Sequence, residues 1–146
     1  MTNPTQTAQD RFAEGFNCSQ AVFSAYAAQL GIDDETALKL ASPFGGGIAH
    51  QGNVCGAVTG ALMALGLARG SASFEKDKKD ETYRIAEDFI KRFREIHGTV
   101  LCRELTGYDI SNPDEFQKAR ESRVFYDTCP GLVKDAAELV SEFLDE

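Results

Sequence analysis

The sequence predicts an all-α fold, built as a single compact domain over residues 1–146. Apolar residues recur with helical spacing along almost the whole chain, and no segment alternates as a strand would. The length suits one domain with a sizeable core, and no repeat, low-complexity segment or linker interrupts it. Residues 54–68 are apolar on every side, which is typical of a buried central helix.

Three helices are expected before this central segment. The first covers residues 5–13. The second begins at Asn17, where Gln20 stands three positions later as in a capping box, and it ends at Gly31. The third spans residues 33–43 and is closed by a proline, because the residue before a proline disfavours helical backbone.

A glycine-rich loop follows at residues 42–47, which read SPFGGG. Three consecutive glycines exclude regular structure and suit a backbone that approaches another segment closely. A phosphate-binding loop would end in Gly-Lys-Ser/Thr, whereas Ile48 and Ala49 come next, so we interpret the loop as a packing turn. For His50 the expected role is a surface or carbonyl-capping residue, and the alternatives are a proton donor and a metal ligand.

The central segment carries glycines at four-residue spacing. Gly52, Gly56 and Gly60 fall along one stripe, and Cys55 lies beside it. Each glycine inside a helix costs up to about 1 kcal/mol relative to alanine. We therefore expect another helix backbone to pack very closely against this stripe.

Four helical segments are expected after the central one. A long amphipathic helix covers residues 74–96 and is ended by Gly98. A brief helix covers residues 100–105. Two further helices begin at Pro113 and Pro130, since proline is favoured at the first helical position.

Each cysteine lies where one of these helices is expected to begin. The four are Cys18, Cys55, Cys102 and Cys129. Asparagine precedes the first by one residue and the second by two, threonine precedes the third by three, and proline follows the fourth. A thiol in the first turn faces unpaired N–H groups and the positive end of the helix dipole. We therefore expect its pKa to fall below the free value of about 8.5.

Charge and composition limit the partners and the compartment. The formal net charge of −8 argues against nucleic acid, because binding requires neutralisation of phosphates. Residues 54–68 are too short and too glycine-rich to span a bilayer, so no membrane insertion is expected. The opening MTNPTQTAQD does not resemble a signal peptide, and we expect a cytoplasmic protein. In that compartment structural disulfides are uncommon, and cysteine sets serve redox or metal chemistry.

The cysteine spacings exclude several familiar motifs. No C-x-x-C occurs, so a thioredoxin-like motif, a zinc ribbon and covalent haem attachment are all absent from the sequence. Buried inert thiols explain any single cysteine well. Inert burial explains less well why four cysteines share a position at the start of a helix.

The cysteine surroundings resemble a known family over nearly the whole chain. Residues 55–60 read C-G-A-x-x-G, Cys18 lies in FNCSQAV, Cys102 in CRELTGYD and Cys129 in CPGLV. In this the chain resembles the C-GCAxxG-C-C family of redox-active proteins. It is also similar to the core of a split-Soret cytochrome, in which comparable cysteines hold an iron–sulfur cluster. The haem motifs of that relative are missing here, so no haem is expected.

Three interpretations stay open. The cysteines are redox thiols that cycle between dithiol and disulfide in two pairs, as in an oxidoreductase. Alternatively they bind metal, as one iron–sulfur cluster or a tetrahedral zinc. The third interpretation is a small helical scaffold without chemistry. Both chemical interpretations predict that the four sulfurs gather at one site with Cys55 at its centre.

The sequence names neither a redox partner nor a substrate. We expect a homodimer, because the glycine stripe suits contact between chains as well as contact within one.

Overall fold

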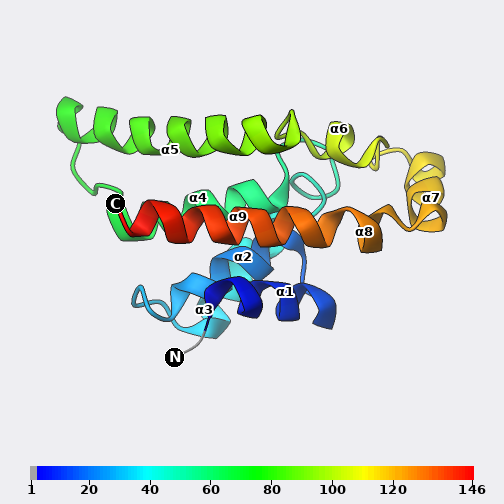
Figure 1. Ribbon diagram of the computed structural model, residues 1–146, viewed down its shortest axis with the longest axis horizontal. Helices are drawn as coiled ribbons and strands as arrows, with labels where there is room; N and C mark the ends of the chain where they lie inside the picture. Colours follow the sequence, from blue (N-terminus) through cyan, green and yellow to red (C-terminus); the bar gives the residue numbers. More distant parts are fainter. Residues whose placement is uncertain (1–2) are drawn as a thin grey trace.

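The computed structural model describes residues 3–146 and consists of α-helices joined by short connections (Figure 1). The helices are α1 (Pro4–Glu14), α2 (Cys18–Ala27), α3 (Asp34–Ala41), α4 (Gly56–Arg69), α5 (Lys76–His97), α6 (Cys102–Thr106), α7 (Pro113–Ser122), α8 (Val124–Asp127) and α9 (Cys129–Leu144), with a 3-10 turn at Ser42–Phe44. Within residues 3–146 the β-type pairing is limited to one antiparallel bridge between Val54 and Leu101. The all-α prediction is confirmed.

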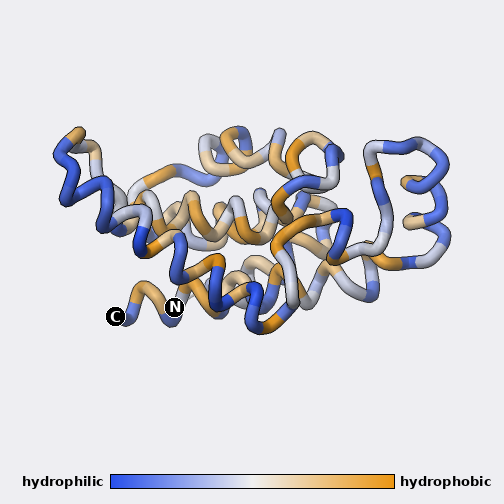
Figure 2. The backbone as a smooth tube through the Cα atoms, turned by 90° about the horizontal axis from the view of Figure 1, so that it is seen from above, coloured by the Kyte–Doolittle hydropathy of each residue, from blue (hydrophilic) through white to orange (hydrophobic). Residues whose placement is uncertain are grey.

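The helices pack around α2, α4 and α9. Helix α2 lies against α4, and α9 contacts α1, α2, α4 and α5. Helix α5 runs along the upper edge of Figure 1 over α4 and α9, while α1 and α3 cover α2 from below. Helices α6, α7 and α8 gather at one end of the molecule. In Figure 2 the first turns of α5 and most of α7, at opposite ends, are hydrophilic, so these parts lie outside the core.

Side-chain caps begin several helices where the sequence predicted them. The Asn17 side chain accepts from the N–H of Gln20, and the Gln20 side chain accepts from the N–H of Asn17, so the expected capping box is present. Asp33, where the third helix was expected to begin, is the N-cap of α3. At α7 the capping residue is Asn112, next to the predicted Pro113. These caps satisfy N–H groups that the first helical turn leaves without partners.

The central helix is shorter at its start than predicted. It begins at Gly56, so Gly52 lies outside the helix and the glycine stripe reduces to Gly56 and Gly60. A Cβ added at Gly60 would lie 2.6 Å from the carbonyl oxygen of Ser19 in α2. At Gly56 it would lie 2.9 Å from the Ser19 nitrogen. The predicted close approach is therefore confirmed, and it joins α4 to α2 within one chain.

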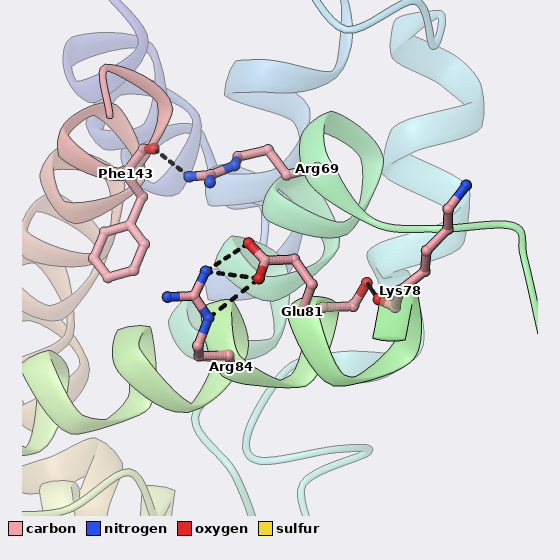
Figure 3. Close-up of polar contacts among 6 residues, drawn as sticks. Arg69, Lys78, Glu81, Arg84 and Phe143 are labelled. Atoms are coloured by element: carbon pink, nitrogen blue, oxygen red, sulfur yellow. Dashed lines mark hydrogen bonds and ion pairs between the residues drawn. The ribbon is translucent and has the colours of Figure 1, made fainter. Parts of the chain in front are cut away.

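Polar contacts tie the far end of the helices together. Figure 3 shows Arg69, in the last turn of α4, donating to the carbonyl oxygen of Phe143 near the end of α9 at 3.1 Å. The buried Tyr26 hydroxyl on α2 donates to the carbonyl oxygen of Ala137 on α9.

No helix within residues 3–146 is both long and apolar enough to cross a membrane.

Candidate functional site

The four cysteines line one cavity of about 210 Å³. They come from the starts of α2, α4, α6 and α9, which meet at the end of the molecule where α6 to α8 gather. Cys55, Cys102 and Cys129 are buried, and Cys18 is partly exposed. Neighbouring cysteines are separated by 37, 47 and 27 positions in the sequence. Their predicted convergence is present in the tertiary structure.

A short antiparallel contact brings Cys55 and Cys102 onto one face. The N–H of Cys55 donates to the carbonyl of Val100 at 2.7 Å, and the N–H of Cys102 donates to the carbonyl of Asn53 at 2.7 Å. Both cysteines follow the bridged residues, so they are diagonal neighbours on the same side of the pairing. Such neighbours have Cα atoms about 7–8 Å apart. Asn53 therefore serves this pairing and does not cap α4, whose N-cap position is Cys55 itself.

Glycines let the other backbone segments approach the thiols. A Cβ added at Gly56 would lie 3.1 Å from the Cβ of Cys18. At Gly47 an added Cβ would lie 2.7 Å from the Cβ of Cys102. Both distances are too short for any larger residue without movement, so the glycine-rich loop and the start of α4 are built around the cysteines.

Cys18 and Cys129 influence each other's pKa. The neighbouring Cys18 side chain lowers the pKa of Cys129 against the opposing effect of burial. Cys129, burial and the charges of the other cysteines raise the pKa of Cys18 well above its ordinary value. Of the four thiols, Cys129 at the start of α9 is the one whose pKa is lowered.

The expected fall in pKa is wrong for the other helix-start thiols as well. Burial raises the pKa of Cys55 to about 11, although the N–H groups of Ala57 and Val58 act in the opposite direction. Burial, together with the charges of Cys55 and Cys129, raises the pKa of Cys102 to about 12. Removal from water outweighs the helix dipole here, because a thiolate loses its hydration in a buried site.

A left-handed turn carries His50 to the same cavity. Ile48, Ala49 and His50 have φ angles of 69°, 49° and 61°, which non-glycine residues rarely adopt. Hydrogen bonds across the turn hold this backbone, such as the one from the N–H of Ala49 to the carbonyl of Pro43 at 2.8 Å. The His50 ring stacks on Phe116 with ring centroids 5.4 Å apart. The packing turn predicted for residues 42–47 is present, but it continues as a left-handed turn, and His50 lines the cysteine cavity.

Most of the remaining wall is apolar, and it was not identified from the sequence. Besides the cysteines, glycines and His50, the cavity is lined by the polar residues Asn17 and Thr106 and by the apolar residues Phe12, Leu105, Ile110, Phe116, Phe125 and Leu132. The apolar residues come from five helices and from the connection between α6 and α7. Each also fits an ordinary core position, so the sequence contains no signal that separates cavity walls from core.

The thiols surround a space and do not meet at a point. A tetrahedral zinc site requires sulfurs about 2.3 Å from a common centre. In the part of the chain from residue 3 onward, no three His, Cys, Asp or Glu side chains are grouped closely enough to hold a metal ion. The four thiols therefore gather as expected in the wall of one cavity, but not around a single metal position.

Fold and site together define a helical protein with a cavity walled by four helix-start cysteines. The family model described as "Putative redox-active protein (C_GCAxxG_C_C)" matches residues 16–143, a range that contains all four. The chain belongs to this family of four-cysteine redox-active proteins, as the motif resemblance predicted. Comparison with curated proteins and with solved structures finds no match.

Proposed function

We propose that this protein performs dithiol–disulfide exchange, with Cys129 as the attacking thiol and Cys18 as its resolving partner. The observation that carries the proposal is that both cysteines line one cavity, at the starts of the packed helices α2 and α9. The Cys18 side chain also lowers the pKa of Cys129, which favours the thiolate on Cys129. A thiolate next to a protonated thiol is the arrangement that exchange chemistry requires.

The exchange proceeds in two displacements. The Cys129 sulfur attacks one sulfur of a small disulfide RSSR, which forms a mixed disulfide and releases RS⁻. The proton of Cys18 passes to a thiolate, and the Cys18 sulfur then attacks Cys129. This second step releases the other RS⁻, which takes a proton from solvent. Two R–SH molecules and one Cys18–Cys129 disulfide result, so the substrate gains the two electrons that the dithiol loses.

Cys55 and Cys102 form a second, slower pair. Their thiols stay protonated at neutral pH because their pKa values are raised to about 11 and about 12. Their diagonal arrangement across the Val54–Leu101 bridge corresponds to a Cα separation of about 7–8 Å. A disulfide spans at most about 7 Å without backbone movement. Oxidation should therefore begin at Cys18 and Cys129.

An iron–sulfur cluster is the second candidate. It is favoured by the presence of four thiols in the wall of one cavity, because four cysteines are the usual ligands of such clusters. Cys18, Cys55, Cys102 and Cys129 would hold it, and it would supply one-electron transfer. A single zinc ion does not fit, because no three side chains between residues 3 and 146 are grouped closely enough to hold one ion.

Disulfide mapping tests the exchange proposal. Reduced protein is treated with hydroxyethyl disulfide without oxygen, alkylated and analysed by mass spectrometry. We expect a Cys18–Cys129 disulfide first, and a persistent mixed disulfide on Cys129 in the Cys18→Ala variant. The Cys55→Ala variant is the matched control and should still form the first disulfide. If Cys55 and Cys102 pair first, or no disulfide forms, the proposal is wrong.

Metal analysis separates the two candidates. Protein purified without oxygen should be colourless and contain neither iron nor sulfide if exchange is its function. Brown protein with iron and sulfide would favour the cluster instead.

The remaining expectations concern assembly and compartment. We propose a homodimer, which sedimentation at tens of micromolar would contradict by showing a monomer. A cytoplasmic location, where thiols are kept reduced, suits the exchange proposal. Tracking a tagged protein in fractionated cells would check it.

A further inference from the structure

The size of the cysteine cavity indicates what kind of molecule can enter it. An apolar cavity of about 150 Å³ accepts benzene. This cavity measures about 210 Å³, enough for one six-membered ring with small substituents. Its walls include the rings of Phe116 and Phe125, whose centroids lie 5.9 Å apart. A flat ring therefore suits both the volume and the walls.

The charge of the walls disfavours a peptide-like disulfide. Among residues 3–146, no lysine, arginine or carboxylate side chain lines the cavity. A disulfide such as oxidised glutathione carries several charged groups, and burying them without partners is costly. An uncharged ring has no charged group to remove from water when it enters the cavity.

His50 is the polar side chain with capacity to bind a ligand. The cavity has two other polar side chains, and both are occupied by protein contacts. Asn17 accepts from the N–H of Gln20 and donates to the carbonyl of Ser42, while Thr106 donates to the carbonyl of Cys102. No hydrogen bond from residues 3–146 engages the His50 ring, and stacking on Phe116 fixes its plane. The left-handed turn thus holds one donor beside an apolar, thiol-lined space.

We propose that this cavity binds a single-ring quinone, with the His50 N–H directed at a quinone oxygen, and that the Cys18–Cys129 dithiol reduces it. This inference rests on the proposed dithiol function and adds the class of oxidant. A quinone combines the required features, since it is flat, uncharged and apolar, carries carbonyl acceptors and takes up two electrons.

The reaction balances without a further reagent. Cys18 and Cys129 lose two electrons and two protons in total as their S–S bond forms. The quinone ring gains the two electrons, and its two carbonyl oxygens gain two protons to give the hydroquinone. One proton comes from the Cys18 thiol. The other comes through His50, which is exposed and can take a proton from solvent.

Ring binding is tested independently of redox chemistry. The probe is p-xylene, a ring that cannot accept electrons, added to reduced protein and followed by NMR. We expect shifts confined to residues of the cavity wall, such as Ile110 and Leu132. Absent or dispersed shifts, together with normal oxidation by hydroxyethyl disulfide, would overturn this inference and leave the exchange proposal standing.

Quinone reduction is then tested with duroquinone, whose ring is fully substituted and forms no addition product with thiols. We expect one hydroquinone and one Cys18–Cys129 disulfide per chain. His50→Phe should slow this reaction about a hundredfold and should slow the reaction with hydroxyethyl disulfide much less, because that reaction needs no donor to a ring oxygen. His50→Gly, which suits the φ angle of 61°, should show the same loss if the phenylalanine variant fails to fold.

Two results would overturn the inference in different ways. An unchanged duroquinone rate in both His50 variants would remove His50 as donor and with it the proposed binding mode. If p-xylene binds but neither duroquinone nor hydroxyethyl disulfide yields a disulfide, the exchange proposal fails and quinone reduction fails with it.

Discussion

The contact between α2 and α4 permits a quantitative test of how the site is assembled. The perturbation is Gly60→Ala, which adds one methyl group facing Ser19 of α2. The matched control is Gly66→Ala in the same helix, where an added Cβ has no neighbour within 4 Å. The two changes are chemically identical and differ only in what the new methyl group meets.

The structure sets the magnitude. The added Cβ at Gly60 would lie 2.6 Å from the Ser19 carbonyl oxygen, whereas ordinary contact begins at 3.4 Å, so α2 must move by 3.4 − 2.6 = 0.8 Å. The contacted atom belongs to backbone, which cannot rotate away. Overpacking of this kind costs about 3 kcal/mol at its upper range. The higher helix propensity of alanine stabilises the variant by about 1 kcal/mol, so the net loss in the free energy of unfolding is about 2 kcal/mol.

Urea unfolding followed by circular dichroism measures both variants. Gly60→Ala should lower the free energy of unfolding by about 2 kcal/mol and Tm by about 4–8 °C, since each kcal/mol shifts Tm by about 2–4 °C at this size. Gly66→Ala should raise the free energy of unfolding by about 1 kcal/mol. If Gly60→Ala is as stable as Gly66→Ala, close backbone packing does not hold the start of α2 against α4.

Three further predictions follow from individual side chains. Tyr26→Phe removes a buried hydroxyl that is hydrogen bonded to α9, and should cost about 1.5 kcal/mol in urea unfolding; no measurable loss would contradict that role. Cys18→Ala should raise the pKa of Cys129, because the neighbouring thiol that lowers it is removed, and an unchanged pH profile of Cys129 alkylation would contradict it. In the folded protein the pKa values of Cys55 and Cys102 are raised to about 11 and about 12 from 9.0, so their protons stabilise the fold fully below pH 9. That stability is lost as the pH rises from 9 to 12, and the urea midpoint should fall more steeply there than in the Cys55→Ala/Cys102→Ala variant.

Helix existence was largely predictable because its determinants are local. The capping box at Asn17 and Gln20, the left-handed Gly98 after α5 and Pro130 in the first turn of α9 each act within a few residues. The short helix α8 was missed, since its four residues are too few to show a helical period. The Val54–Leu101 bridge was missed because single-residue pairing leaves no pattern in either segment.

The thiol chemistry was less predictable. The position of each cysteine at a helix start could be inferred from neighbouring residues, but the sign of most pKa shifts could not. The neighbouring residues of Cys55 and Cys102 indicate a helix dipole that would lower the pKa of each thiol. They do not indicate burial, which raises both pKa values and is produced by the packing of distant helices. His50 is exposed, as the sequence predicted, but nothing near it in the sequence indicates that its ring stacks on Phe116 and lines the cavity.

By itself the sequence determined the helical class, the helix-start positions of the four cysteines, and a glycine motif that predicted close packing and family membership. These properties depend on residues within about one helical turn of each other. Only the tertiary structure decided that the start of α2 lies near the start of α9, that the thiols surround a cavity, and that most of the cavity wall is apolar. Those properties depend on helices far apart in the chain, because burial and hydrogen bonding are set by whichever side chains the packing brings together.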